Sequence, residues 1–124
     1  MKLLLTLALA AATVAAQHHS HGPAPAGPVK LLPGMGNWEH RIETRSPEAQ
    51  KFFNQGLALL YGFNRGEARR AFEQAAKLDP QAAMPHWGIA ASVGPYINMD
   101  MEPPVDWKRV CGELAIGQKL ARNE

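Results

Sequence analysis

The chain has 124 residues, enough for one small domain, and its 13 Lys and Arg residues against 11 Asp and Glu give a formal net charge of +2. This near-neutral mixture of signs excludes the basic surface that binds nucleic acid and the polybasic patch that binds a membrane. Cys111 is the only cysteine, so no disulfide can form within the chain, and we expect a small, buried side chain there.

Residues 1–16 predict a secretory signal peptide. Lys2 is followed by leucine, alanine, valine and threonine, and the stretch ends in the small residues Val14-Ala15-Ala16. The alternative is an uncleaved membrane anchor, but about fourteen largely apolar residues are fewer than the ~20 that a spanning helix needs. We therefore expect an exported protein, periplasmic or extracellular, whose mature chain, one lysine shorter, has no membrane span.

Residues 17–45 predict a His- and Pro-rich linker and an irregular lead-in to the folded part. Up to residue 36 the prolines stand among glycines and alanines without periodic apolar partners, so this part cannot build a core and is expected to be extended and mobile. In residues 37–45, Trp38 and Ile42 are four positions apart and are expected to cover the helices that follow.

Residues 46–124 predict an all-α domain of about four helices. Ser46-Pro47-Glu48 is a strong helix start, because it offers a hydroxyl cap, a proline at the first helical position and an acid near the positive end of the helix dipole. The first expected helix covers residues 47 to 62 or 63, and the second follows a turn at 64–66 and runs to about residue 78. A third follows Pro80, carries Met84 and Val93, and is ended by Gly94-Pro95, and a last one starts at residue 105 or 106.

The last helix has apolar residues on two sides. One side carries Trp107, Val110, Cys111, Leu114 and Ala115, and another carries Ile116 and Leu120. A helix with two apolar stripes needs two neighbours, and helical repeats bury their apolar faces only by stacking. Further repeats of the same chain, or another chain, are expected to cover the second side.

Small and aromatic residues within positions 50–80 stand at a characteristic spacing, and the pattern holds at Phe52, Gly56, Ala68, Phe72 and Pro80. This order resembles the tetratricopeptide repeat, a helix-turn-helix unit of 34 residues. The sequence departs from the pattern at Gln55, where the family has leucine, and at Leu59, where it has tyrosine. The pattern positions of the first helix are residues 52, 55, 56 and 59. The residues 34 positions after them continue the pattern, and they are His86, Ile89, Ala90 and Val93.

The second half of the next unit is not found at the repeat distance, since Ala68 and Phe72 correspond to Glu102 and Asp106. The resemblance therefore implies about one and a half to two tetratricopeptide-like hairpins, arranged as an α-solenoid. It also implies a concave surface, lined by the first helix of each unit, that binds another protein or peptide. The partner-binding residues it implies are Gln50, Phe53, Leu57, Leu60, Tyr61, Met84, Trp87 and Ala91. The alternative is that Phe53, Tyr61 and Trp87 fill the space between helices.

A second hypothesis is a periplasmic copper- or nickel-binding protein. If the signal peptide is cleaved after residue 16, the third residue of the mature chain is a histidine, and an amino terminus followed by such a histidine can bind Cu(II) or Ni(II) in a square plane. A methionine-containing loop could supply thioether ligands to Cu(I). The residues of this hypothesis are His18, His19, His21, Met99 and Met101.

The sequence does not predict an enzyme or a bound cofactor. His40 with Glu43 and Asp79 with His86 are pairs by count only, and no serine or cysteine stands in a nucleophile motif. The favoured interpretation is a protein-protein interaction scaffold of the cell envelope or secreted space. A third possibility is the stabilising first cap of a larger protein.

Overall fold

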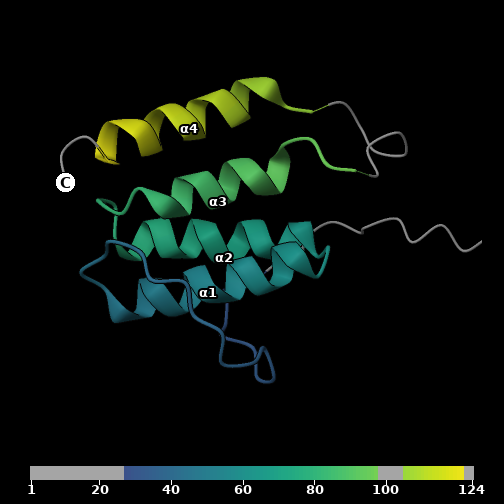
Figure 1. The fold of residues 1–124 in the computed structure, drawn as a ribbon, viewed down its shortest axis with the longest axis vertical. Coiled ribbons are helices and arrows are strands. Elements are labelled where there is room, and N and C mark those ends of the chain that lie inside the picture. The colour runs from purple at the N-terminus through teal and green to yellow at the C-terminus, as the bar shows by residue number, and fades with distance from the viewer. Residues whose placement is uncertain (1–26, 98–104, 122–124) are drawn as a thin grey trace, which may run out of the picture.

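The computed structural model describes residues 27–97 and 105–121, and this part of the chain is all-helical, without strands. The four helices are α1 (Pro47–Tyr61), α2 (Arg65–Leu78), α3 (Met84–Val93) and α4 (Trp107–Ala121). Each helix packs against the next one along the chain, and α1 also touches α3 (Figure 1). The prediction of an all-α protein with about four helices is confirmed for these residues, whereas the predicted signal peptide lies outside them.

The helix starts follow their capping residues. The Ser46 hydroxyl accepts a hydrogen bond from the Ala49 amide at 3.1 Å, and Pro47 occupies the first turn, as predicted. The second helix begins at Arg65, earlier than predicted, because the Asn64 side chain caps it by accepting from the amide of Glu67. The first helix correspondingly ends at Tyr61, one or two residues before the predicted end.

Phe72 of α2 lies at the centre of the helical packing. Its side chain is fully buried, and its ring centroid is 5.4 Å from that of Phe53 on α1. A Cβ atom added to Gly56 of α1 would lie 2.6 Å from Phe72 Cε1, and one added to Gly88 of α3 would overlap the same ring. The two glycines therefore allow the backbones of α1 and α3 to approach the same Cδ1–Cε1 edge of one aromatic ring.

Alanine residues form most of the remaining contact between the first helices. Four of them are fully buried, and they are Ala49, Ala68, Ala71 and Ala75. Because these side chains are short, they allow α1 and α2 to pack closely. Leu57, Leu59 and Ile89 complete the core around Phe72.

The fourth helix contacts the stack along one side only. Val110 is its only buried residue among the described positions, and polar contacts hold the same side: Arg109 donates to Glu73 of α2, and Glu113 bonds to His86 of α3. Cys111 is exposed, so the expectation of a buried cysteine is wrong. The predicted first stripe of α4 is therefore mostly open to solvent.

We predict that Gly88→Ala destabilises the protein by about 1–3 kcal/mol, because the new methyl group must displace the Phe72 ring in a closely packed core. Urea unfolding followed by circular dichroism would measure the change. The matched control is Gly112→Ala in α4, where an added Cβ meets nothing within 4 Å. That substitution is expected to stabilise the helix by about 0.5–1 kcal/mol. Equal losses for both variants would contradict the packing described here.

Candidate functional site

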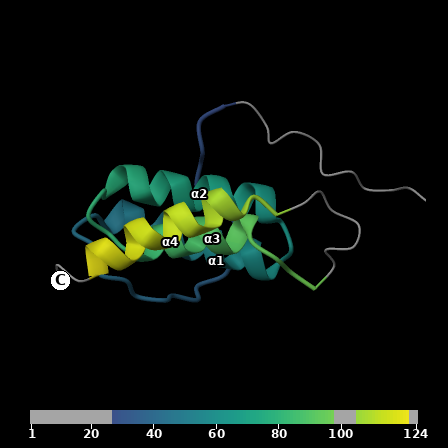
Figure 2. The same ribbon diagram turned by 90° about the horizontal axis from the view of Figure 1, so that it is seen from above.

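Residues 27–45 wrap around α1 instead of extending away from the helices. Figures 1 and 2 show that this segment starts on the side of α2 and crosses to the opposite side of α1. Arg70 of α2 donates to the carbonyl of Gly27 at 2.6 Å. Gln55 of α1 accepts from the amide of Leu32 at 2.7 Å and donates to the carbonyl of Lys30 at 3.0 Å. Residues 27–36 fall within the predicted linker, and here side chains of α1 and α2 bond to the backbone of Gly27, Lys30 and Leu32.

The next part of this segment, residues 37–43, is called the strap below. Two amide side chains of α1 bond to its main chain. The Asn54 side-chain oxygen accepts from the amide of His40 at 3.2 Å, and the Gln50 side-chain oxygen accepts from the amide of Ile42 at 3.0 Å. The Gln50 side-chain nitrogen donates to the carbonyl of His40 at 2.8 Å. Of the predicted covering residues, Ile42 packs against the core, whereas Trp38 is exposed.

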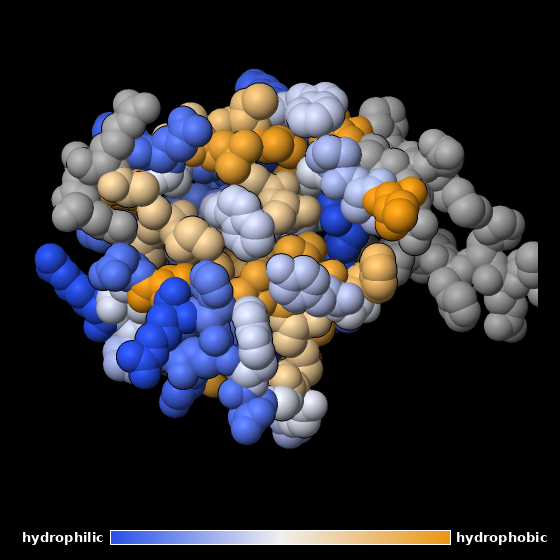
Figure 3. Space-filling model, in the orientation of Figure 1, coloured by the Kyte–Doolittle hydropathy of each residue, from blue (hydrophilic) through white to orange (hydrophobic). Residues whose placement is uncertain are grey.

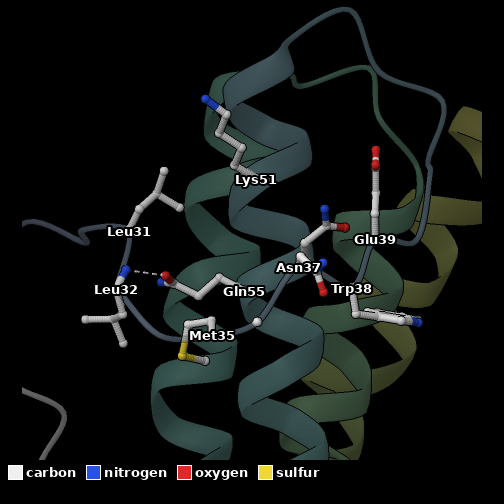
Figure 4. Close-up of a pocket in the computed structure, with 10 residues that line it drawn as sticks. Leu31, Leu32, Met35, Asn37, Trp38, Glu39, Lys51 and Gln55 are labelled. Atoms are coloured by element: carbon white, nitrogen blue, oxygen red, sulfur yellow. Dashed lines mark hydrogen bonds between the residues drawn. The ribbon is translucent and has the colours of Figure 1, made fainter.

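An open hollow of about 300 Å³ lies between α1 and the residues that precede and begin the strap. Figure 4 shows Gln55 reaching from α1 to the backbone of Leu32, with Met35 beside it and Trp38 on the other side of the helix. The lining combines apolar side chains with Lys51 and Asn54 of α1. The segment therefore arches over this part of α1 without filling the space beneath it.

Asp79, just after α2, fixes the chain where it enters α1. Its carboxylate accepts hydrogen bonds from the Thr44 hydroxyl at 2.6 Å and from the Arg45 amide at 2.8 Å, and its other oxygen accepts from the Gln81 amide at 3.1 Å. The pKa of Asp79 lies below its usual value of 3.8, chiefly because of the bond from Thr44 and then that from Arg45, while burial opposes the shift. The ionised carboxylate thus ties the lead-in segment to the α2–α3 connection.

The structure divides the eight predicted partner-binding residues. Phe53 and Leu57 are core, 0% and 3% exposed, so they support the surface from below and do not form it; this is the alternative considered for Phe53. Tyr61 and Trp87, at 71% and 40%, are exposed. The others are half-buried: Gln50, which bonds to the strap, and Leu60, Met84 and Ala91.

All three tryptophans of the chain are exposed. Trp38 and Trp107 are both 57% exposed, and Trp87 is the least exposed of the three. The core is built instead from phenylalanine, alanine and leucine. Large aromatic side chains that a protein leaves outside its core are typical of interaction surfaces.

Phe63 is an exposed aromatic residue that the sequence reasoning missed. It lies in the α1–α2 turn with φ of 61°, and it is the only non-glycine residue with positive φ within residues 27–97 and 105–121. Glycine or asparagine takes this conformation at lower cost. The sequence could have indicated this residue, because an aromatic side chain stands between Gly62 and Asn64. A turn at that place requires neither a large nor an apolar side chain.

Charge is distributed unevenly among the helices. The 14 residues of α2 include Glu67, Arg69, Arg70, Glu73 and Lys77 as well as Arg65 at the start, whereas α3 has no Asp, Glu, Lys or Arg. The carboxylates of α2 are paired within or between helices, Glu67 with Arg70 and Glu73 with Arg69 and Arg109. Figure 3 shows hydrophilic residues gathered at the lower left and apolar residues across the centre and upper part of this face. Within α3 itself, His86 is the only titratable side chain, and it bonds to Glu113 of α4.

The residues of the metal hypothesis, His18, His19, His21, Met99 and Met101, lie outside the described part of the chain. Within the described part, no three or more His, Cys, Asp or Glu side chains gather where they could hold a metal ion. The members of one catalytic pair considered, Asp79 and His86, have other partners. Asp79 bonds to Thr44, and His86 of α3 bonds to Glu113 of α4, with 2.8 Å between Nδ1 and Oε2. No described helix is long and apolar enough to cross a membrane.

Comparison with family models, with curated proteins and with solved structures finds no match to this chain. The candidate site is accordingly defined by its own geometry: an exposed, nearly uncharged surface of α1 and α3, with the strap bonded to the amino-terminal half of α1.

We predict that Asp79→Asn destabilises the protein at pH 7 and that the difference from the unsubstituted protein shrinks as the pH falls below about 4. Because the folded-state pKa of Asp79 is lowered, its carboxylate stabilises the fold above the unfolded-state pKa. That contribution is lost as the pH falls through the folded-state pKa. Unfolding free energies measured between pH 3 and 7 check this.

The control for this series is Glu39→Gln, which removes a carboxylate whose described ion pair, with Arg41, is 3.8 Å long and solvent-exposed. Its effect on stability should be small at every pH. If Asp79→Asn costs nothing at pH 7, the described bonds from Thr44 and Arg45 do not stabilise the fold.

Proposed function

We propose that this chain is a protein-protein interaction scaffold of an exported protein, and that its helices form tetratricopeptide-like hairpins. The partner would bind the surface of α1 and α3, the first helices of the two units. Two features support the repeat arrangement: the spacing of small and aromatic residues, and the packing of Phe72 against Gly56. The proposed location, periplasmic or extracellular, rests on the character of residues 1–16.

The single observation that carries the proposal is the exposure of every tryptophan, together with Tyr61. A small domain has few large apolar side chains with which to stabilise its core. Here Trp87 and Tyr61, on the two helices that form the proposed surface, remain 40% and 71% exposed. Tryptophan and tyrosine are the residues that most often dominate binding energy at protein interfaces.

The charge distribution favours a particular kind of partner. Because α3 has no charged side chain and α1 has only Glu48 and Lys51, the surface offers little to attract a strongly acidic or basic segment. Its exposed aromatic residues and the amide of Asn54 suit a partner segment that combines apolar anchors with unpaired backbone groups. We therefore propose a weakly charged, apolar peptide or helix as the partner.

Phe63 supports the same proposal. Its backbone has the left-handed conformation that disfavours a residue with a Cβ, and its ring is 62% exposed and lies outside the core. We predict that Phe63→Gly leaves the protein as stable as before, or more stable by up to about 1 kcal/mol. Thermal unfolding would check this, and a loss of more than that amount would show that the ring is structural.

We predict that Trp87→Ala and Tyr61→Ala fold normally but lose binding. Displayed peptide libraries selected against the full chain would supply the ligand, and titration calorimetry would measure each variant. An anchor residue is expected to contribute at least about 2 kcal/mol, which corresponds to about a thirtyfold rise in Kd. The unfolding midpoints of both variants should stay close to that of the unsubstituted protein.

The matched control is Lys77→Ala, an exposed position on α2, which should leave Kd unchanged. Selected peptides that bind all of these variants equally well would contradict the proposed surface. Failure of Trp87→Ala to fold would mean that its half-exposed ring is needed by the core.

A further inference from the structure

The strap is held on α1 through the main chain of residues 40 and 42. His40 is bonded through its amide and its carbonyl, and Ile42 through its amide, to the side chains of Gln50 and Asn54. Residues 40 and 42 of an extended chain point to the same side, and Ile42 packs against the core cluster. The strap thus makes the contacts that an extended peptide bound to this helix would make.

The contacts of the strap are few and solvent-exposed at its centre. Trp38 is 57% exposed, and the ion pair of Glu39 with Arg41 has side chains 50% and 90% exposed. The ring of His40 lies between those of Trp38 and Phe53, with 6.1 Å between centroids on each side. Since the preceding residues arch over an open hollow, close packing does not secure this part of the chain.

Both ends of the segment, in contrast, are fixed. Before the strap, Gln55 bonds to the backbone on both sides of Leu31; after it, Thr44 and Arg45 bond to the carboxylate of Asp79, which is 8% exposed. The middle can therefore lift from α1 while the two ends stay in place.

We propose that the strap is a displaceable internal ligand, which occupies the amino-terminal half of the α1 surface and must lift before an extended peptide can bind there. The surface beneath it, formed by Gln50 and Asn54, continues on the same face of α1 to Tyr61, seven residues beyond Asn54. The peptide that fits has extended backbone with an apolar, β-branched residue at the position of Ile42. Lifting of the strap would regulate peptide binding to the surface of the proposed function. Only the biological purpose of the strap rests on that function.

The first test uses hydrogen exchange of the full chain. The amides of His40 and Ile42 should exchange much faster than those in the middle of α1, because they open without global unfolding. Gln50→Ala removes two bonds to the strap and should accelerate exchange at Ile42 by at least about tenfold, which corresponds to a loss of about 1.4 kcal/mol. Exchange of these two amides at the global unfolding rate would overturn the proposal.

The second test supplies the strap in trans. The probe is a fluorescent synthetic peptide of residues 37–45, added to the full chain and to a variant whose residues 37–43 are replaced by Gly and Ser. A tethered segment competes at an effective concentration of the order of millimolar, so the unsubstituted chain should bind the peptide at least about tenfold more weakly than the replaced variant. Adding Gln50→Ala and Asn54→Ala to the replaced variant should abolish binding.

A matched pair of strap variants covers the case in which the replaced variant fails to fold. Trp38→Ala/His40→Ala removes the ring contacts, whereas Glu39→Ala/Arg41→Ala removes only the exposed ion pair. The first should bind the peptide several-fold more tightly than the second. Equal binding by both, or by the unsubstituted chain and the replaced variant, would overturn the proposal. These results do not depend on Trp87, so the proposed function can fail separately, in the library experiment.

Discussion

The fold depends on the ring of Phe72, which fits between its neighbouring helices because Gly56 and Gly88 have no side chains. Phe72 of α2 is fully buried between α1 and α3, and side chains at Gly56 or Gly88 would overlap it. Because one ring contacts both flanking helices, it sets the distance and relative position of α1 and α3. Those two helices carry Tyr61 and Trp87, so the same ring determines how the candidate surface is formed.

Charged and aromatic side chains are distributed differently over the helices. Glu67, Arg69, Arg70 and Glu73 of α2 pair with one another and with Arg109 of α4, while α3 has no Asp, Glu, Lys or Arg and the tryptophans remain outside the core. Exposed aromatic surface in a small protein carries a risk of aggregation. The strap covers part of α1, since its backbone bonds to Gln50 and Asn54 and Ile42 packs against the core.

The helices could be predicted from the sequence because their ends are encoded locally. Ser46-Pro47 and Asn64 mark helix starts, and Gly94 marks a helix end. The predicted start of α2 was wrong by two residues, because residues 64–66 were expected to form a turn and Asn64 instead caps the helix. The wrapping of residues 27–45 could not be predicted, because side-chain amides such as Gln50 and Gln55 bond to backbone groups that every residue has. Gln55 appeared as a departure from the repeat pattern and is instead the anchor of this segment. The exposure of Cys111 depends on what lies beside α4, which its own periodicity does not specify.

A double-mutant cycle tests the role of Phe72 most directly. Unfolding free energies would be measured for Gly88→Ala in the natural background and in a Phe72→Leu background, where a smaller side chain leaves room for the added methyl group. If the ring sets the separation of α1 and α3, the glycine substitution should cost at least about 1 kcal/mol less in the second background. Equal costs in both backgrounds would show that Phe72 and Gly88 do not limit each other and would contradict this account.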